Sequence, residues 1–213
     1  CHQIMMEHYV CPGELIFGAD SHTCSYGALG AFGTGVGCTD LLYGMVTGKS
    51  WVLVPETVKF NLVGKLPEGV YARDLILTII GTIGANGCNY QVMEFTGEGA
   101  KTLSISERMV LCNMAVEAGA KTGIFEPDEK AIEYLEAHGR KPKALFTSDP
   151  DAVYAREYTF DLSKIRPVVA KPDFVDNLVP AEEVRGVKID EAFLGSCNNG
   201  RIEDLRVGAS IIK

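Results

Sequence analysis

The stretch that most restricts the fold reads Gly18-Ala19-Asp20-Ser21-His22-Thr23. It follows the run 14–17, which we expect to form a short strand that ends at this polar loop. Glycines then recur at close spacing, at positions 27, 30, 33, 35 and 37. Such spacing requires tight turns or a close approach of two backbone segments. A polar loop at the end of a strand is where α/β proteins commonly bind ligands.

The glycines do not fit a dinucleotide-binding fingerprint. That fingerprint is G-x-G-x-x-G, whereas the window from Gly35 reads Gly35-x-Gly37-x-x-Asp40. We therefore interpret the glycines as a packed turn behind the polar loop. A nicotinamide-dependent oxidoreductase is not favoured.

Asp20, Ser21 and His22 are adjacent in the chain, which disfavours a hydrolase triad. Neighbouring side chains cannot easily face one another as nucleophile and base. Two interpretations remain open: a capped turn in which Asp20 and Ser21 bond their own backbone, or an acid–base cluster at a strand end. Spacing alone does not choose between them.

The whole chain predicts an α/β fold of layered α/β/α subdomains. We expect three parts, over residues 1–55, 56–149 and 150–213. Thr39 is expected to cap a short helix that ends at Met45. Further strands are expected at 58–62, 91–95 and 192–194. Further helices are expected at 72–83, from a capping box at Ser104 to Gly119, from Pro127 to Gly139, and from Arg201 onward.

Cys197 lies in the loop Gly195-Ser196-Cys197-Asn198-Asn199-Gly200, before the last expected helix. The positive end of a helix dipole favours a thiolate, which could act as a nucleophile or a metal ligand. A single cysteine is nevertheless more often simply buried. Five other cysteines have no ligand spacing and are expected to be core thiols, at positions 11, 24, 38, 88 and 112.

Bulk composition excludes several classes of protein. The net charge is −8 with no block of Lys and Arg, so nucleic-acid binding is not expected. No apolar run reaches the ~20 residues that span a bilayer. Seven cysteines without a CxxC pair favour the reducing cytoplasm. The chain lacks an initial Met and stops inside a helical pattern, which we interpret as a piece of a longer polypeptide.

Four separated motifs together resemble the aconitase superfamily, and they follow its order over nearly the whole chain. The sequence after Cys197 is most similar to that of the 3-isopropylmalate dehydratase and homoaconitase large subunits. The motifs are Cys1-His2-Gln3 with Glu7-His8-Tyr9 and Pro12-Gly13, the Asp20 loop, Val92-Met93-Glu94-Phe95 with Gly97-Glu98-Gly99, and Gly195 to Arg206.

This resemblance implies a hydro-lyase that isomerises a hydroxy di- or tricarboxylic acid by dehydration and rehydration on a 4Fe-4S cluster. The expected substrate is 3-isopropylmalate, in leucine biosynthesis. Homoaconitase or citramalate isomerase activity is the alternative. A cluster-free regulatory or binding homologue is the alternative from another class.

The resemblance also implies a role for each matched residue. Cys197 is expected to be the first of three thiolate ligands of the cluster. His22 and Glu94 are expected to manage the proton on bound water or hydroxide. His2 and Asp20 would form a second histidine–carboxylate pair, and Ser21 would bind a substrate carboxylate. We expect His2, Asp20, His22, Glu94 and Cys197 to converge on one cleft.

Two departures from the family pattern restrict what this chain does alone. Asn198 stands where many members have threonine. No closely spaced cysteine pair follows Cys197, and the family's catalytic serine belongs to a swivelling domain that this sequence does not include. That domain implies a small-subunit partner, which is expected to choose among substrates.

Overall fold

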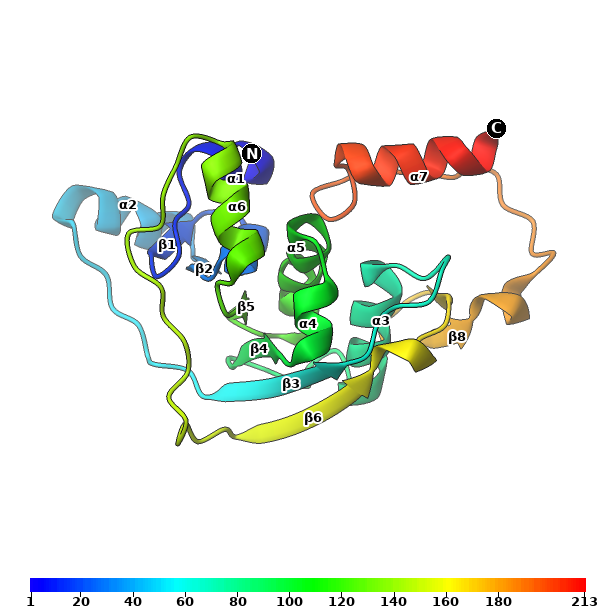
Figure 1. The fold of residues 1–213 in the computed structure, drawn as a ribbon, viewed down its shortest axis with the longest axis horizontal. Helices are drawn as coiled ribbons and strands as arrows, with labels where there is room; N and C mark the ends of the chain where they lie inside the picture. Colours follow the sequence, from blue (N-terminus) through cyan, green and yellow to red (C-terminus); the bar gives the residue numbers. More distant parts are fainter.

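A four-stranded parallel sheet forms the main layer of the protein (Figure 1). The computed structural model describes all residues from Cys1 to Lys213. The strand order is β5-β4-β3-β6. The strands are β3 (Thr57–Val63), β4 (Val92–Thr96), β5 (Thr122–Phe125) and β6 (Arg156–Asp161). The α/β class expected from the sequence is confirmed.

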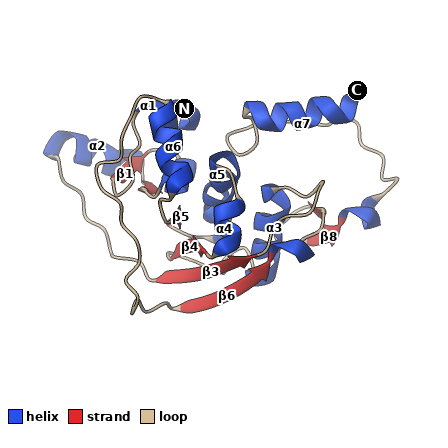
Figure 2. Ribbon diagram, in the orientation of Figure 1, coloured by secondary structure: helices blue, strands red, loops and turns tan.

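Helices stand on one side of this sheet, as Figure 2 shows by colour. They are α3 (Ala72–Ile83), α4 (Glu98–Thr102), α5 (Ile105–Asn113), its 3-10 continuation η2 (Met114–Ala118) and α6 (Glu129–Ala137). The expected capping box at Ser104 is present, with its side chain accepting from the Glu107 backbone. α3 has the predicted bounds.

The core lies between the sheet and these helices. Side chains alternate along β3, so that Val58, Phe60 and Leu62 are buried on the helix side. Phe60 packs on Phe95 of β4 with ring centroids 5.6 Å apart, and Phe95 stacks on Phe125 of β5 at 5.0 Å. Side chains on the opposite face of the sheet therefore point away from this core.

A second, smaller sheet holds the Asp20 loop. β1 (Leu15–Gly18) pairs in parallel with β2 (Phe32–Gly35), and the 3-10 helix η1 (Ser21–Leu29) connects them. η1 packs on α5 and β5, which joins the small sheet to the main layer. The helix α1 (His2–His8) also packs on η1.

The last part of the chain is loosely packed. β6 pairs with β3, so the main sheet continues across the expected boundary near residue 150. The chain then forms η3 (Leu162–Lys164), the antiparallel pair β7 (Val168–Ala170) and β8 (Leu178–Pro180), η4 (Ala181–Val184) and α7 (Ile202–Ile212). No helix of the protein is both long and apolar enough to span a membrane.

Three local expectations are wrong. α2 (Cys38–Thr47) begins after Gly37, so Thr39 lies inside the helix and does not cap it. α6 is capped by Asp128, whose side chain accepts from the Ala131 backbone, and Pro127 precedes the cap. Residues 192–194 form no strand, and Phe193 is 81% exposed. An apolar triplet becomes a strand only where a neighbour offers backbone partners, and no strand pairs with this one.

All seven cysteines are free. Cys11, Cys24, Cys88 and Cys112 are buried, as expected of core thiols. Cys38 is exposed, which contradicts its expected core position, because α2 buries none of its residues.

Candidate active site

The Asp20 loop is built by close backbone packing. Asp20 caps η1, and its carboxylate accepts from the His22 backbone at 2.7 Å. A methyl group at Gly27 would lie 1.7 Å from the carbonyl oxygen of Gly123 on β5. At Gly33 it would lie 2.2 Å from the carbonyl oxygen of Thr23. The glycines therefore pack the loop against two strands, as the interpretation of a packed turn requires.

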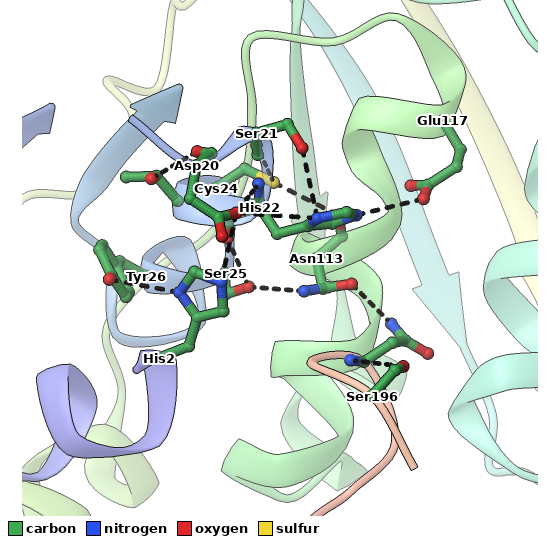
Figure 3. Close-up of polar contacts among 12 residues, drawn as sticks. His2, Asp20, Ser21, His22, Cys24, Ser25, Tyr26, Asn113, Glu117 and Ser196 are labelled. Carbon is green, nitrogen blue, oxygen red and sulfur yellow. Dashed lines mark hydrogen bonds and ion pairs between the residues drawn. The ribbon is translucent and has the colours of Figure 1, made fainter. Parts of the chain in front are cut away.

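Asp20 lies between two histidines, as Figure 3 shows. One carboxylate oxygen, Oδ1, is 3.5 Å from Nε2 of His2 and 3.8 Å from Nδ1 of His22. His2 is buried, and its Nδ1 lies 3.3 Å from the Tyr26 hydroxyl. Burial lowers the pKa of His2, against the opposing attraction of Asp20. The structure thus favours a neutral imidazole at His2.

His22 has a second carboxylate partner, Glu117 of η2. The distance from His22 Nε2 to Glu117 Oε1 is 3.3 Å, and both side chains are partly exposed. Nδ1 of His22 lies 3.3 Å from the hydroxyl of Ser21. The other carboxylate oxygen, Oε2 of Glu117, is buried without a hydrogen-bond partner in the chain. A carboxylate on one ring nitrogen fixes the tautomer and the orientation of the ring.

Glu94 does not contact His22, which corrects the pairing expected from the sequence. Its carboxylate accepts from the Ser148 hydroxyl at 3.0 Å and from the Tyr154 hydroxyl at 3.0 Å. Neighbouring residues of a strand point to opposite faces. Phe95 points into the core, so Glu94 lies on the other face of the sheet, beside Lys59 in the register of β3.

Cys197 lines a cavity of about 350 Å³. His2, Asp20 and Cys197 all line this cavity, which also touches Arg201. Cys197 is exposed, and the residue before it, Ser196, has a φ of 75°. A non-glycine residue in this left-handed region is strained, and such strain often lies at functional sites.

The structure therefore brings together five of the residues that the sequence singles out. His2, Asp20 and Cys197 share the cavity, His22 joins them through Asp20, and Ser21 contacts His22. Glu94 stays apart.

Sequence reasoning missed Glu117, although the chain carries a signal for it. Glu117 stands in the last turn before the helix-ending Gly119. An acidic side chain at that end opposes the helix dipole, so its local effect is unfavourable. A locally unfavourable residue of this kind points to a functional role.

The residues of the cavity fit part of an iron–sulfur site. Such clusters are held mainly by cysteine thiolates, and Cys197 offers one at the cavity. The carboxylate of Glu117 and the imidazole of His22, 3.3 Å apart, are suited to proton transfer. Cys1, His2 and Asp20 also place three possible ligand atoms within 4.8 Å of one another. The two cysteines that line the cavity, Cys1 and Cys197, are too few to hold a cluster without further ligands.

Comparison with known proteins gives consistent similarities. The family model described as "Aconitase family (aconitate hydratase)" matches residues 1–213. The chain is 51% identical to the 3-isopropylmalate dehydratase large subunit 1 of Methanopyrus kandleri, over 100% of the chain and 51% of that protein. It is 54% identical to the 3-isopropylmalate dehydratase large subunit of Heliobacterium modesticaldum, over 96% of the chain and 49% of that protein.

A relative named for another activity is nearly as similar. The chain is 50% identical to the probable methanogen homoaconitase large subunit of Methanothermobacter thermautotrophicus, over 100% of the chain and 50% of that protein. The chain thus spans about half the length of the curated relatives that it matches.

Proposed function

This chain belongs to the aconitase family, and on that basis we propose that it forms the acid–base half of a hydro-lyase active site. The whole enzyme would isomerise a hydroxy acid by removing water and adding it back. The observation that carries this proposal is the position of Asp20, between two histidines and at a cavity that Cys197 also lines.

His22 and Glu117 are suited to move the proton of the departing hydroxyl. Hydroxide is a poor leaving group, so it needs both an acid and a metal at neutral pH. Glu117 stabilises the imidazolium of His22 when the ring holds a proton. Ser21, beside His22, would donate a hydrogen bond to a substrate carboxylate.

His2 and Asp20 form the second pair. Because His2 is buried and favoured in its neutral form, it would orient Asp20 at the cavity through the 3.5 Å contact of its Nε2 with the carboxylate. Cys197 would provide one thiolate ligand of a 4Fe-4S cluster. When bound through three thiolates, that cluster supplies an open iron as a Lewis acid for the substrate hydroxyl and carboxylate.

We further propose 3-isopropylmalate as the substrate and a small subunit as the partner. The names of two relatives support this substrate, and their designation as large subunits supports the partner. The homoaconitase relative supports homocitrate-type acids as the second candidate. The residues of this chain would bind the part that these acids share.

The test uses the full-length large subunit, reconstituted with iron and sulfide without oxygen. His22→Ala should retain iron but lose turnover, whereas Cys197→Ser should lose iron and turnover together. A wild-type protein that binds no iron and turns over no hydroxy acid would support the regulatory alternative. Exchange of small subunits of different specificity should change the preferred substrate. A preference that stays with the large subunit would contradict the division of roles.

A further inference from the structure

Asn198 is the one buried residue in the last part of the chain. Every other residue from Arg166 to Lys213 is exposed or half-buried, whereas Asn198 is 4% exposed. α7 buries none of its residues, and Figure 1 draws it apart from the main sheet. The Cys197 loop is therefore anchored at Asn198, with help from Arg201, which donates to Ser106 on α5.

The side chain of Asn198 makes three hydrogen bonds in the protein interior. Its Oδ1 accepts from Nη1 of Arg73 on α3 at 2.5 Å. Its Nδ2 donates to the carbonyl of Val110 at 3.2 Å and to Oδ1 of Asn113 at 3.0 Å. Both of these acceptors belong to α5.

Asn113 carries the connection on to the Asp20 loop. Its Nδ2 donates to the Ser25 hydroxyl at 2.9 Å, and that hydroxyl donates to the carbonyl of His22 at 2.7 Å. Figure 3 shows Asn113 and Ser25 side by side between the two loops. Each of these two residues is 1% exposed. We call Asn198, Asn113 and Ser25 the amide relay.

The chemistry of Arg73 sets the direction of every bond in the amide relay. A guanidinium only donates, so the oxygen of Asn198 must face Arg73 and its amide nitrogen must face α5. Asn113 must then accept from Asn198 and donate to Ser25. A buried network in which each donor finds an acceptor holds one arrangement, because any reversed amide would place two like groups together.

We propose that the amide relay positions the Cys197 loop relative to His22 before a cluster binds. This proposal rests on the proposed function, in which Cys197 is a cluster ligand and His22 is the acid–base residue. Asn198, Asn113 and Ser25 would act through their neighbours without touching substrate. Groups that support metal ligands in this way commonly change metal affinity or activity about 10–100-fold when removed.

The first experiment uses the full-length, cluster-free protein. Hydrogen–deuterium exchange of residues 193–200 and 20–26 is measured together with the alkylation rate of Cys197, followed by peptide mass spectrometry. Asn198→Ala should raise the exchange of both segments by about tenfold or more, because buried groups lose their partners. It should also change the alkylation rate of Cys197, whose thiol is already exposed and whose loop is anchored at Asn198. Asn199→Ala is the matched control, since Asn199 is the adjacent amide and bonds only to Asp204 of α7. Unchanged exchange and alkylation in Asn198→Ala would overturn the proposal.

The second experiment uses the cluster-loaded enzyme with its small subunit. Asn198→Ala should lower kcat about 10–100-fold with a smaller change in KM. Ser25→Ala, a smaller truncation at the His22 end, should shift the pH profile of kcat while iron content stays near wild type. Wild-type kinetics and pH profiles in both variants would refute a positioning role. A protein that never binds iron would contradict the proposed function, and the first experiment would still decide this proposal.

Discussion

Replacement of Glu117 by glutamine tests which carboxylate assists His22. The change keeps the size of the side chain and removes its charge. It leaves a carbonyl or amide group 3.3 Å from the Nε2 of His22, where the carboxylate oxygen lies. The imidazolium that forms when His22 takes a proton then loses its ionic partner.

The expected size of the effect follows from this distance. Two unit charges 3.3 Å apart attract by about 5 kcal/mol at an effective dielectric of about 20, and by about 1 kcal/mol in bulk water. The side chains of His22 and Glu117 are 26% and 31% exposed, so solvent screens part of the attraction. We expect a loss of about 1–3 kcal/mol in the transition state, which lowers kcat about 5–150-fold.

The assay is steady-state turnover of the loaded full-length enzyme, with iron content measured on the same samples. Glu94→Gln is the control, because Glu94 bonds Ser148 and Tyr154 on the far face of the sheet. It should keep kcat close to wild type. If Glu94→Gln loses as much turnover as expected for Glu117→Gln while Glu117→Gln does not, the assignment of the pair from geometry is refuted.

Three further outcomes are expected. Cys197→Ser should abolish the stable cluster while the fold stays intact. Cys38→Ser, which replaces an exposed thiol on α2, should keep the iron content of the wild type. Equal iron content in the two variants would refute the role of Cys197 as a ligand. The pKa of His2 is lowered in the folded state, so the unfolded state binds more protons in acid. The contribution of His2 to the free energy of unfolding is therefore fully present above about pH 6.5 and is lost as the pH falls below that value. Urea unfolding of His2→Gln should therefore show a weaker decline in acid than the wild type does, and an equal decline would contradict this. Arg108 is 1% exposed and forms a bidentate ion pair with Asp128. Arg108→Leu should therefore lower the free energy of unfolding by about 3 kcal/mol. A loss below about 1 kcal/mol would mean that this ion pair contributes no more than a solvent-exposed one.

Local elements of the fold were predictable because their signals lie within the elements themselves. The apolar face of α3 and the capping box at Ser104 each need only residues a few positions apart. The same holds for the glycines of the Asp20 loop. The run 192–194 fails this condition, since a strand requires a partner elsewhere in the chain.

Residues of the candidate site could be predicted where they belong to one contiguous motif. Contacts between segments far apart in the chain could not. Asp20, Ser21 and His22 are contiguous, and Cys197 stands out in its own loop. The partner of His22 is 95 residues away in the chain, and only the packing of η1 on the end of α5 brings Glu117 to it. Glu94 had a family motif around it, but its strand turns its side chain to the opposite face.

At Gly27 the site has no room for a side chain, so a substitution that adds even one methyl group should disturb it. A methyl group there would meet the carbonyl oxygen of Gly123 at 1.7 Å, and the two segments would have to separate by about 1 Å or more to restore ordinary contact. His22 lies on the same short helix and would move with it. A displacement of about 1 Å at a reacting group can cost about 100-fold in rate. Substitution of Gly27 should therefore lower turnover even when the new side chain is a single methyl group.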